Sequence, residues 1–183
     1  MKTFTTFISE SNLSRIFKHT SERNIGMISA SRGDKSKEEN AENTSRLKDA
    51  IRQHGYGHII TKGVYPEEGT GRTGYEHSYL VIGNKGHEDS EKLKSFLTQQ
   101  GARFEQDSVL HKPHDTPNAS LIGTGKSDWI KKGESKDAGT WHPDRVGEFH
   151  SKLHNQKSFA FESFTLEYPQ NFFGAWSKHL SNK

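Results

Sequence analysis

The stretch NIGMISASRGDKS, residues 24–36, decides the fold. Its first seven residues form a mostly apolar run, which is typical of a buried strand. The following SRGDKS is polar and contains Gly33, as expected for a turn. Ser36 precedes Glu39 by three positions, which is the capping-box pattern at the start of a helix. The stretch therefore predicts a buried strand that leads through a polar loop into a helix.

Beyond this stretch, the apolar positions predict two helices, near residues 38–54 and 90–100. Glycines follow both apolar patterns, and Asp89 or Ser90 is the expected cap of the second helix. The side chains expected to face the sheet are Leu47, Ile51, Leu93, Phe96 and Leu97. Further strands are expected at 56–65, 77–83, 107–111, 119–125 and within 158–168. Residues 125–140 are rich in Gly, Lys and Ser, so we interpret them as an exposed loop that precedes a short helix beginning at Pro143.

Strands with helices between and after them predict an α/β or α+β fold, in which helices pack on a mixed β-sheet. The 183 residues suit a single domain. We expect this domain to span residues 11–183, with a core over 24–124 and a C-terminal extension over 125–183. Residues 1–10 are expected to be a separable element.

The composition restricts the function classes. There is no cysteine, which excludes disulfides, thiolate nucleophiles and cysteine-bound zinc. The net charge is only +3 and no run of five basic residues occurs, so a dedicated DNA-binding protein is not expected. Residues 1–10 are too short and too polar to span a bilayer, which takes about 20 apolar residues, and we expect no membrane partner. His150 and His154 stand four apart on a predicted helix, but the glutamate of H-E-x-x-H is missing, so we expect neither metal nor cofactor.

Ser29, Ser31 and Arg32 lie where the first strand leads into the helix. Hydroxyl groups, a guanidinium and the free N–H groups of a helix start can together bind a phosphate or another anion. The alternative is a polar loop in which Gly33 makes the turn. No glycine-rich phosphate-binding motif is present, so this ligand site is predicted from residue types alone.

Glu76, His77 and Asp107 are the candidate catalytic residues, because they lie on or beside strands predicted to be central. If these strands neighbour the first one, their polar side chains meet Ser29 and Arg32 at one rim of the sheet. Glu76 or His77 would then be a general base. The alternative is a hydrogen-bonded network that fixes the ends of the strands.

The N-terminal stretch MKTFTTFISE, residues 1–10, places Phe4, Phe7 and Ile8 on one face of a short helix. It resembles the capsid-targeting peptide of internal proteins of T-even-like phages. Ile8 and Glu10 fit the site at which the prohead protease of that family cuts, and Ser11 would become the new N-terminus. The resemblance implies the prohead scaffold and the prohead protease as partners of residues 1–10, and weak contact with packaged DNA. It also implies a location in the virion interior and, after ejection, in the host cytoplasm.

Residues 24–124 are similar to a family known only as domain of unknown function 3293, through the stretches ISASRGDKSKEENAENTSRLKDAIRQHGYG, EHSYLVIG and FEQDSVL. This second resemblance implies an α/β fold and no function. The resemblance of residues 1–10 predicts a phage virion-internal protein that binds or inhibits an unknown host protein, in host takeover or anti-defence. The alternative is a small enzyme that acts on a nucleotide or another phosphorylated ligand through the Ser29–Arg32 loop.

Overall fold

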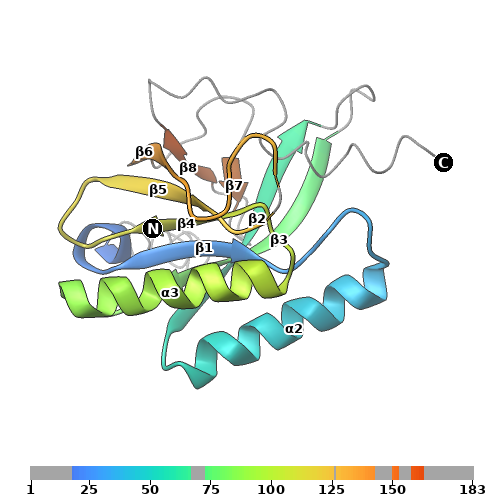
Figure 1. Ribbon diagram of the computed structural model, residues 1–183, viewed down its shortest axis with the longest axis horizontal. Coiled ribbons are helices and arrows are strands. Elements are labelled where there is room, and N and C mark those ends of the chain that lie inside the picture. Colours follow the sequence, from blue (N-terminus) through green and yellow to red (C-terminus); the bar gives the residue numbers. More distant parts are fainter. Residues whose placement is uncertain (1–17, 67–72, 126, 143–149, 153–157, 163–183) are drawn as a thin grey trace, which may run out of the picture.

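The computed structural model describes residues 18–66, 73–125, 127–142, 150–152 and 158–162. Two long helices and eight strands follow one another along this part of the chain (Figure 1). The elements are β1 (Ile25–Ser29), α2 (Lys37–Gln53), β2 (Gly57–Pro66), β3 (Thr73–Ile82), α3 (His87–Arg103), β4 (Ser108–Lys112), β5 (Asn118–Gly123), β6 (Ser135–His142), β7 (His150–Lys152) and β8 (Ser158–Glu162).

The strands form a closed barrel in the order β1-β3-β2-β7-β8-β6-β5-β4. Each pairing between described strands is antiparallel. The elements from β1 to β4 have the β-α-β-β-α-β order of a ferredoxin-like unit, with the spatial order β2-β3-β1-β4. The later strands β5 to β8 continue from β4 back to β2, so they close the sheet on itself.

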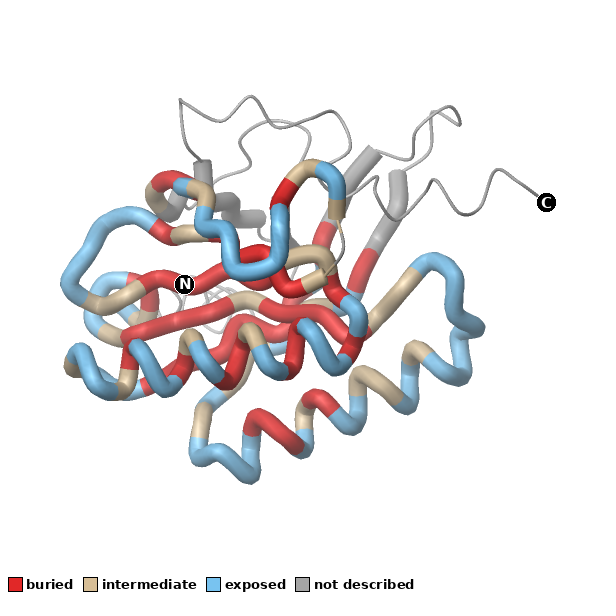
Figure 2. Tube along the Cα trace, viewed as in Figure 1, coloured by how far each residue is buried: buried red, intermediate tan, exposed pale blue. Residues whose placement is uncertain are grey.

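Both helices lie on the same side of β1 (Figure 1). α2 begins where Ser36 and Glu39 exchange the two hydrogen bonds of a capping box. One stripe of each helix is buried, including Leu47 and Ile51 of α2 and Leu93 and Leu97 of α3. The opposite faces are exposed (Figure 2), so each helix is amphipathic and packs on the sheet through one side.

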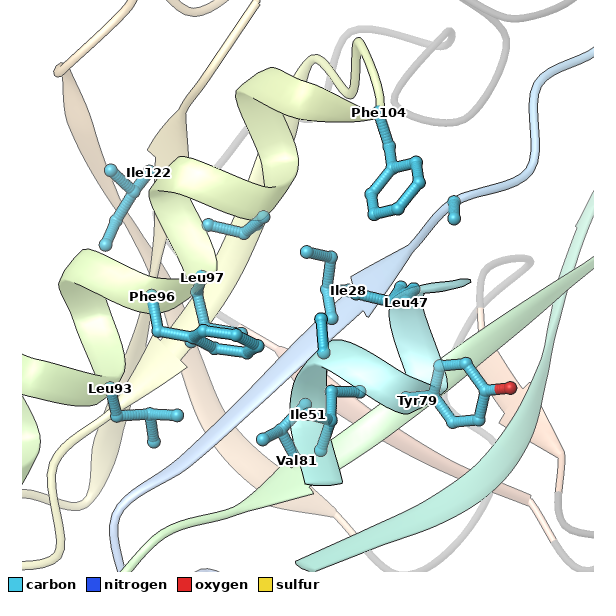
Figure 3. Close-up of a cluster of buried hydrophobic side chains, with 13 residues drawn as sticks. Ile28, Leu47, Ile51, Tyr79, Val81, Leu93, Phe96, Leu97, Phe104 and Ile122 are labelled. Carbon is cyan, nitrogen blue, oxygen red and sulfur yellow. The ribbon is translucent and has the colours of Figure 1, made fainter. Parts of the chain in front are cut away.

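Two apolar clusters fill the molecule because side chains alternate along each strand. On β1, Ile28 joins the cluster between helices and sheet (Figure 3), whereas Met27 packs against a second cluster on the other face of the sheet. The second cluster consists of Leu110, Ala119, Leu121, Ile130 and Ala138. Since Met27 pairs with Leu80 and Leu110, we place this second cluster inside the barrel.

The predicted fold class is confirmed: a single domain with helices packed on a β-sheet. The helices expected near 38–54 and 90–100 are present, and the five side chains expected to face the sheet are buried. The cap expected at Asp89 or Ser90 is wrong, because α3 already begins after Gly86. None of the helices in the described ranges combines the length and the apolar character that crossing a bilayer needs.

The prediction for residues 125–140 as an exposed loop is wrong. This segment contains the start of β6, and Ile130 and Ala138 are buried inside the barrel. The helix expected after Pro143 is also not found over residues 150–152, which form β7 instead. β8 confirms the strand expected within 158–168, and it pairs with β6 on one side and β7 on the other. The peptide of residues 1–10 lies outside the described residues.

Candidate functional site

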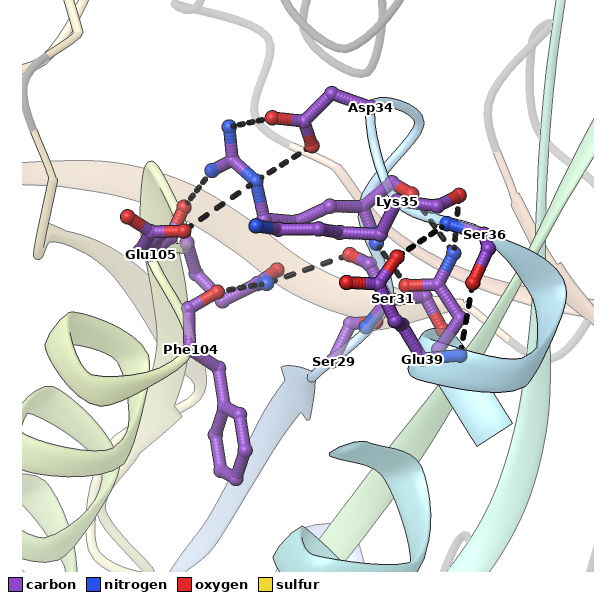
Figure 4. Close-up of polar contacts among 11 residues, drawn as sticks. Ser29, Ser31, Asp34, Lys35, Ser36, Glu39, Phe104 and Glu105 are labelled. Atoms are coloured by element: carbon purple, nitrogen blue, oxygen red, sulfur yellow. Dashed lines mark hydrogen bonds and ion pairs between the residues drawn. The ribbon is translucent and has the colours of Figure 1, made fainter. Parts of the chain in front are cut away.

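The loop between β1 and α2 is held by hydrogen bonds from both ends (Figure 4). The side chain of Asn40 accepts from the backbone N–H of Arg32 at 2.8 Å and donates to the carbonyl of Arg32 at 2.8 Å. At the strand end, the hydroxyl of Ser29 donates to the carbonyl of His77 at 2.8 Å and accepts from the N–H of Ser31 at 3.0 Å. The loop that sequence reasoning selected is therefore fixed in place.

The guanidinium of Arg32 ties this loop to the end of α3. It donates to both carboxylate oxygens of Asp34, at 2.8 and 3.2 Å, and to the carbonyl of Glu105. This contact lowers the pKa of Asp34 and raises that of Arg32. Glu105 has φ +54°, a conformation uncommon for a residue other than glycine. Asp34 and the Glu105 carbonyl take three of the five N–H donors of the guanidinium, so Arg32 is largely engaged within the protein.

Glu76 is the most unusual group near this loop. It lies on β3 opposite Gly63 of β2, and only 8% of it is exposed. Burial raises its pKa from 4.5 to about 7, and the Ser29 hydroxyl opposes the rise where it donates to the carboxylate in place of the His77 carbonyl. No lysine or arginine in the described ranges forms an ion pair with Glu76. Glu76 lies four residues before Leu80 on the same strand. Side chains an even number of positions apart lie on the same face, so Glu76 points to the barrel side of the sheet.

Asp107 and its neighbour Gln106 lie at the same end of β1. Gln106 donates from Nε2 to the carbonyls of Phe104 and Ser31, at 2.9 and 3.3 Å, so it joins α3 to the loop. Burial raises the pKa of Asp107, and the charge of Arg32 and a hydrogen bond with Trp129 oppose the rise. Asp107 is thus a second partly buried carboxyl group close to the loop.

The structure brings most of the predicted site residues together. Ser29 contacts both Ser31 and Glu76, and Arg32 lies close enough to Asp107 to shift its pKa. His77 is not among them: it is exposed and, as the direct neighbour of Glu76, it lies on the opposite face of β3. The processing site Ile8, Glu10 and Ser11 lies outside the described residues.

Sequence reasoning missed Trp129 and Glu105 as neighbours of the site. Trp129 packs against the apolar cluster inside the barrel, and the ammonium of Lys136 lies 5.5 Å from its ring centre. It is the single aromatic residue of the stretch 125–140, and an aromatic residue within a polar segment is a signal of burial that could have identified it. Glu105 takes part through its backbone carbonyl and through its carboxylate, 3.9 Å from Nε of Arg32, and no local sequence pattern indicates either contact.

Comparison with known proteins gives one match to a family. The model of the S-adenosylmethionine lyase family matches residues 26–175. Among solved structures, a phage S-adenosylmethionine (SAM) lyase in complex with S-methyl-5'-thioadenosine is similar, with 18% identity and a TM-score of 0.32. That similarity covers 62% of this chain and 85% of the other. No curated protein sequence matches the chain.

These findings overturn the two resemblances. The T-even-like internal protein is wrong as an identity because it rests on ten residues, and patterns this short often arise by chance. Its implied partners, the prohead scaffold, the prohead protease, packaged DNA and a host protein to inhibit, lose their basis with it. Domain of unknown function 3293 is wrong because the stretches that suggested it lie almost wholly within the matched residues 26–175. Since this match spans most of the sequence, the chain belongs to the S-adenosylmethionine lyase family.

Proposed function

We propose that the chain is an enzyme that cleaves S-adenosylmethionine without water, in the cytoplasm of a host cell. Its family supports the class of reaction. The observation that carries the site is Glu76, a buried carboxyl group without a basic partner among the described residues. This proposal replaces the host-factor inhibitor. The alternative drawn from the sequence was a small enzyme acting on a nucleotide or another phosphorylated ligand through the Ser29–Arg32 loop, and the proposal keeps the small enzyme but with a nucleoside substrate that has no phosphate.

The charge of the substrate favours Glu76 over the Ser29–Arg32 loop as the recognition group. S-adenosylmethionine contains an adenosine but no phosphate, and its sulfonium and ammonium groups are positive. A buried carboxyl group is costly to ionise alone, and an arriving cation offsets this cost. Arg32 is itself a cation and already pairs with Asp34, so it would not recognise the sulfonium or ammonium group. Binding of the substrate should therefore ionise Glu76 and hold the positive charge at the Ser29 end of β1.

The proposed reaction breaks the bond between the sulfonium sulfur and Cγ of the amino-acid part. The electron pair of this bond goes to sulfur, which leaves as neutral S-methyl-5'-thioadenosine. The substrate's own carboxylate oxygen forms the new bond to Cγ, so the second product is homoserine lactone and no proton is transferred. One positive and one negative charge disappear in this step, so surroundings poor in water favour it. Leu110 and Leu121 provide such surroundings within the barrel.

We expect Glu76→Gln to lower kcat/KM for S-adenosylmethionine by about 100-fold or more, because the neutral amide of glutamine does not offset the positive charge of the substrate. The assay follows S-methyl-5'-thioadenosine and homoserine lactone by liquid chromatography, without any methyl acceptor. Glu42→Gln is the matched control, since Glu42 is exposed on α2 and pairs with Arg46. It should stay within twofold of the wild type.

Two results would contradict this proposal. Absence of both products from the wild-type reaction would remove the lyase activity itself. Equal rates for Glu76→Gln and Glu42→Gln would keep the activity but move the site away from Glu76. Thermal melts of both variants ensure that a lost activity is not a lost fold.

A further inference from the structure

A pocket of about 510 Å³ lies at the opposite end of β1 from Ser29. It is lined by residues of the turn between α2 and β2, of the end of β3, and of the segment before β1. Ile82 at the end of β3 pairs with Ile25 at the start of β1, which places the pocket at the Ile25 end of the sheet. This surface is therefore separate from the site proposed for the lyase reaction.

The lining of this pocket is basic. Arg23, Arg52, His19 and His58 all contribute to it. Arg52 is exposed in the last turn of α2 and forms no ion pair with a carboxylate of the described chain. Burial lowers the pKa of His58, and the charges of Arg52 and Lys48 lower it further, with no carboxylate opposing them. The positive charges around His58 are therefore not balanced by a nearby carboxylate.

Two acidic side chains close to the pocket lining, Asp89 and Glu22, are occupied elsewhere. Asp89 accepts hydrogen bonds from the side chain of Asn24 at 3.1 Å, and from the backbone and side chain of Asn84 at 2.8 and 3.2 Å. Glu22 lies 3.8 Å from the ammonium of Lys85. Neither carboxylate pairs with Arg52, so a guanidinium at this pocket is open to an external anion.

We propose that this pocket binds a small phosphate-bearing anion of nucleotide size. Guanidinium groups match the geometry of phosphate oxygens, and Arg52 and Arg23 supply two of them. The volume lies within the range of small-molecule sites, about 300–1,000 Å³. A DNA backbone would instead need a long basic patch or stripe, and the chain has a net charge of only +3. The ligand differs from S-adenosylmethionine, which contains no phosphate.

The test compares two arginines in equivalent positions. Arg52 and Arg103 both stand exposed in the last turn of a 17-residue helix, but only Arg52 lines the pocket. Isothermal titration of the full chain with ADP and with inorganic pyrophosphate measures binding at low ionic strength. We expect saturable one-to-one binding of both probes to the wild type and to Arg103→Glu, and at least tenfold weaker binding to Arg52→Glu. Arg52→Ala with Arg103→Ala repeats the comparison without a charge reversal.

Several results would overturn the proposal. These are no binding at millimolar probe, equal loss in both variants, or binding of a DNA duplex that ADP does not displace. A fourth is loss of S-adenosylmethionine cleavage by Arg52→Glu without any probe, which would assign the pocket to the substrate. Binding of the probes is measured without S-adenosylmethionine, so its outcome does not depend on whether the proposed lyase reaction is correct. Unchanged cleavage by Arg52→Glu together with lost ADP binding is the expected combination.

Discussion

At the scale of single residues, the environment decides what a side chain can do. Glu76 and Glu42 are the same residue type, yet one is buried with a pKa of about 7 and the other is exposed beside Arg46. The sequence could indicate Glu76 as a candidate because it lies in a predicted strand. It could not show that His77, its direct neighbour, lies on the other face and exposed, since this depends on the register of β3 with β1.

Gly123 illustrates the same dependence through packing. A Cβ atom at this position would overlap the carbonyl oxygen of Lys131, and hydrogen bonds from Gly123 to Glu134 and from Gly133 to Gly123, both 2.9 Å, hold that loop close. We expect Gly123→Ala to lower the free energy of unfolding by about 1–3 kcal/mol, because the loop must move. The measurement is urea unfolding followed by circular dichroism.

Gly63 is the control for this substitution. It also lies in a strand, but its nearest neighbours would be 3.6 Å or more from a new Cβ atom, which is ordinary contact. Gly63→Ala should therefore change stability little. Equal costs at the two positions would mean that the loss comes from the strand backbone and not from the Lys131 contact.

At the scale of elements, local signals predicted the helices well. α2 and α3 were predicted because caps and apolar spacing act within a few residues of the chain. The start of α3 was missed because Asp89, a typical cap residue, uses its carboxylate to hold Asn84 and Asn24 instead. β6 was missed because residues 125–140 are rich in Gly, Lys and Ser and show no strand pattern, although β6 pairs with the preceding β5 and with β8. β7 was missed because it has only three residues and one of its partners, β2, is far away along the chain.

The packing of the helices gives a prediction at this scale. Leu47 of α2 and Leu93 of α3 are fully buried between helices and sheet. Replacing either by Ala should cost about 2–5 kcal/mol, the sum of lost burial and of the cavity left behind. Ile60→Ala is the control, because Ile60 is 56% exposed on β2. The measurement is denaturant unfolding of the three variants. A loss of unfolding free energy for Leu47→Ala or Leu93→Ala as small as that for Ile60→Ala would contradict the buried faces of the two helices.

At the scale of the whole molecule, barrel closure brings the candidate site together. Ser29, Glu76 and Asp107 come from three strands or their ends, and Trp129 comes from the segment before β6. The sequence predicted that the first three would meet if their strands were neighbours, and β1 does lie between β3 and β4. The contribution of Trp129 required the β5–β6 pairing, which no local pattern of residues 125–140 indicates.

Two buried titratable groups on opposite faces of the sheet also couple the whole fold to pH. Burial raises the pKa of Glu76 from 4.5 to about 7. Burial, and then the charge of Lys94, lower the pKa of His111 from 6.5 to about 4, where Ser90 lies 3.2 Å from its ring. Glu76 contributes its full stabilisation below pH 4.5, where it is neutral, and this contribution is lost as pH rises through 7. Neutral His111 stabilises it above pH 6.5, and this is lost as pH falls through 4.

The two contributions have opposite signs between pH 5 and 7, so they partly cancel in the wild type. Each is worth up to about 3 kcal/mol, because one pKa unit corresponds to about 1.4 kcal/mol. Glu76→Gln should therefore expose the His111 contribution, with stability rising from pH 5 to 7. His111→Gln should expose the Glu76 contribution, with stability falling over the same range. Urea unfolding is measured at both pH values. The difference between a variant and the wild type cancels the surface groups and leaves the contribution of the replaced residue with its sign reversed, so this difference should rise from pH 5 to 7 for Glu76→Gln and fall for His111→Gln. Parallel slopes for the two variants would show that neither group titrates as its burial requires.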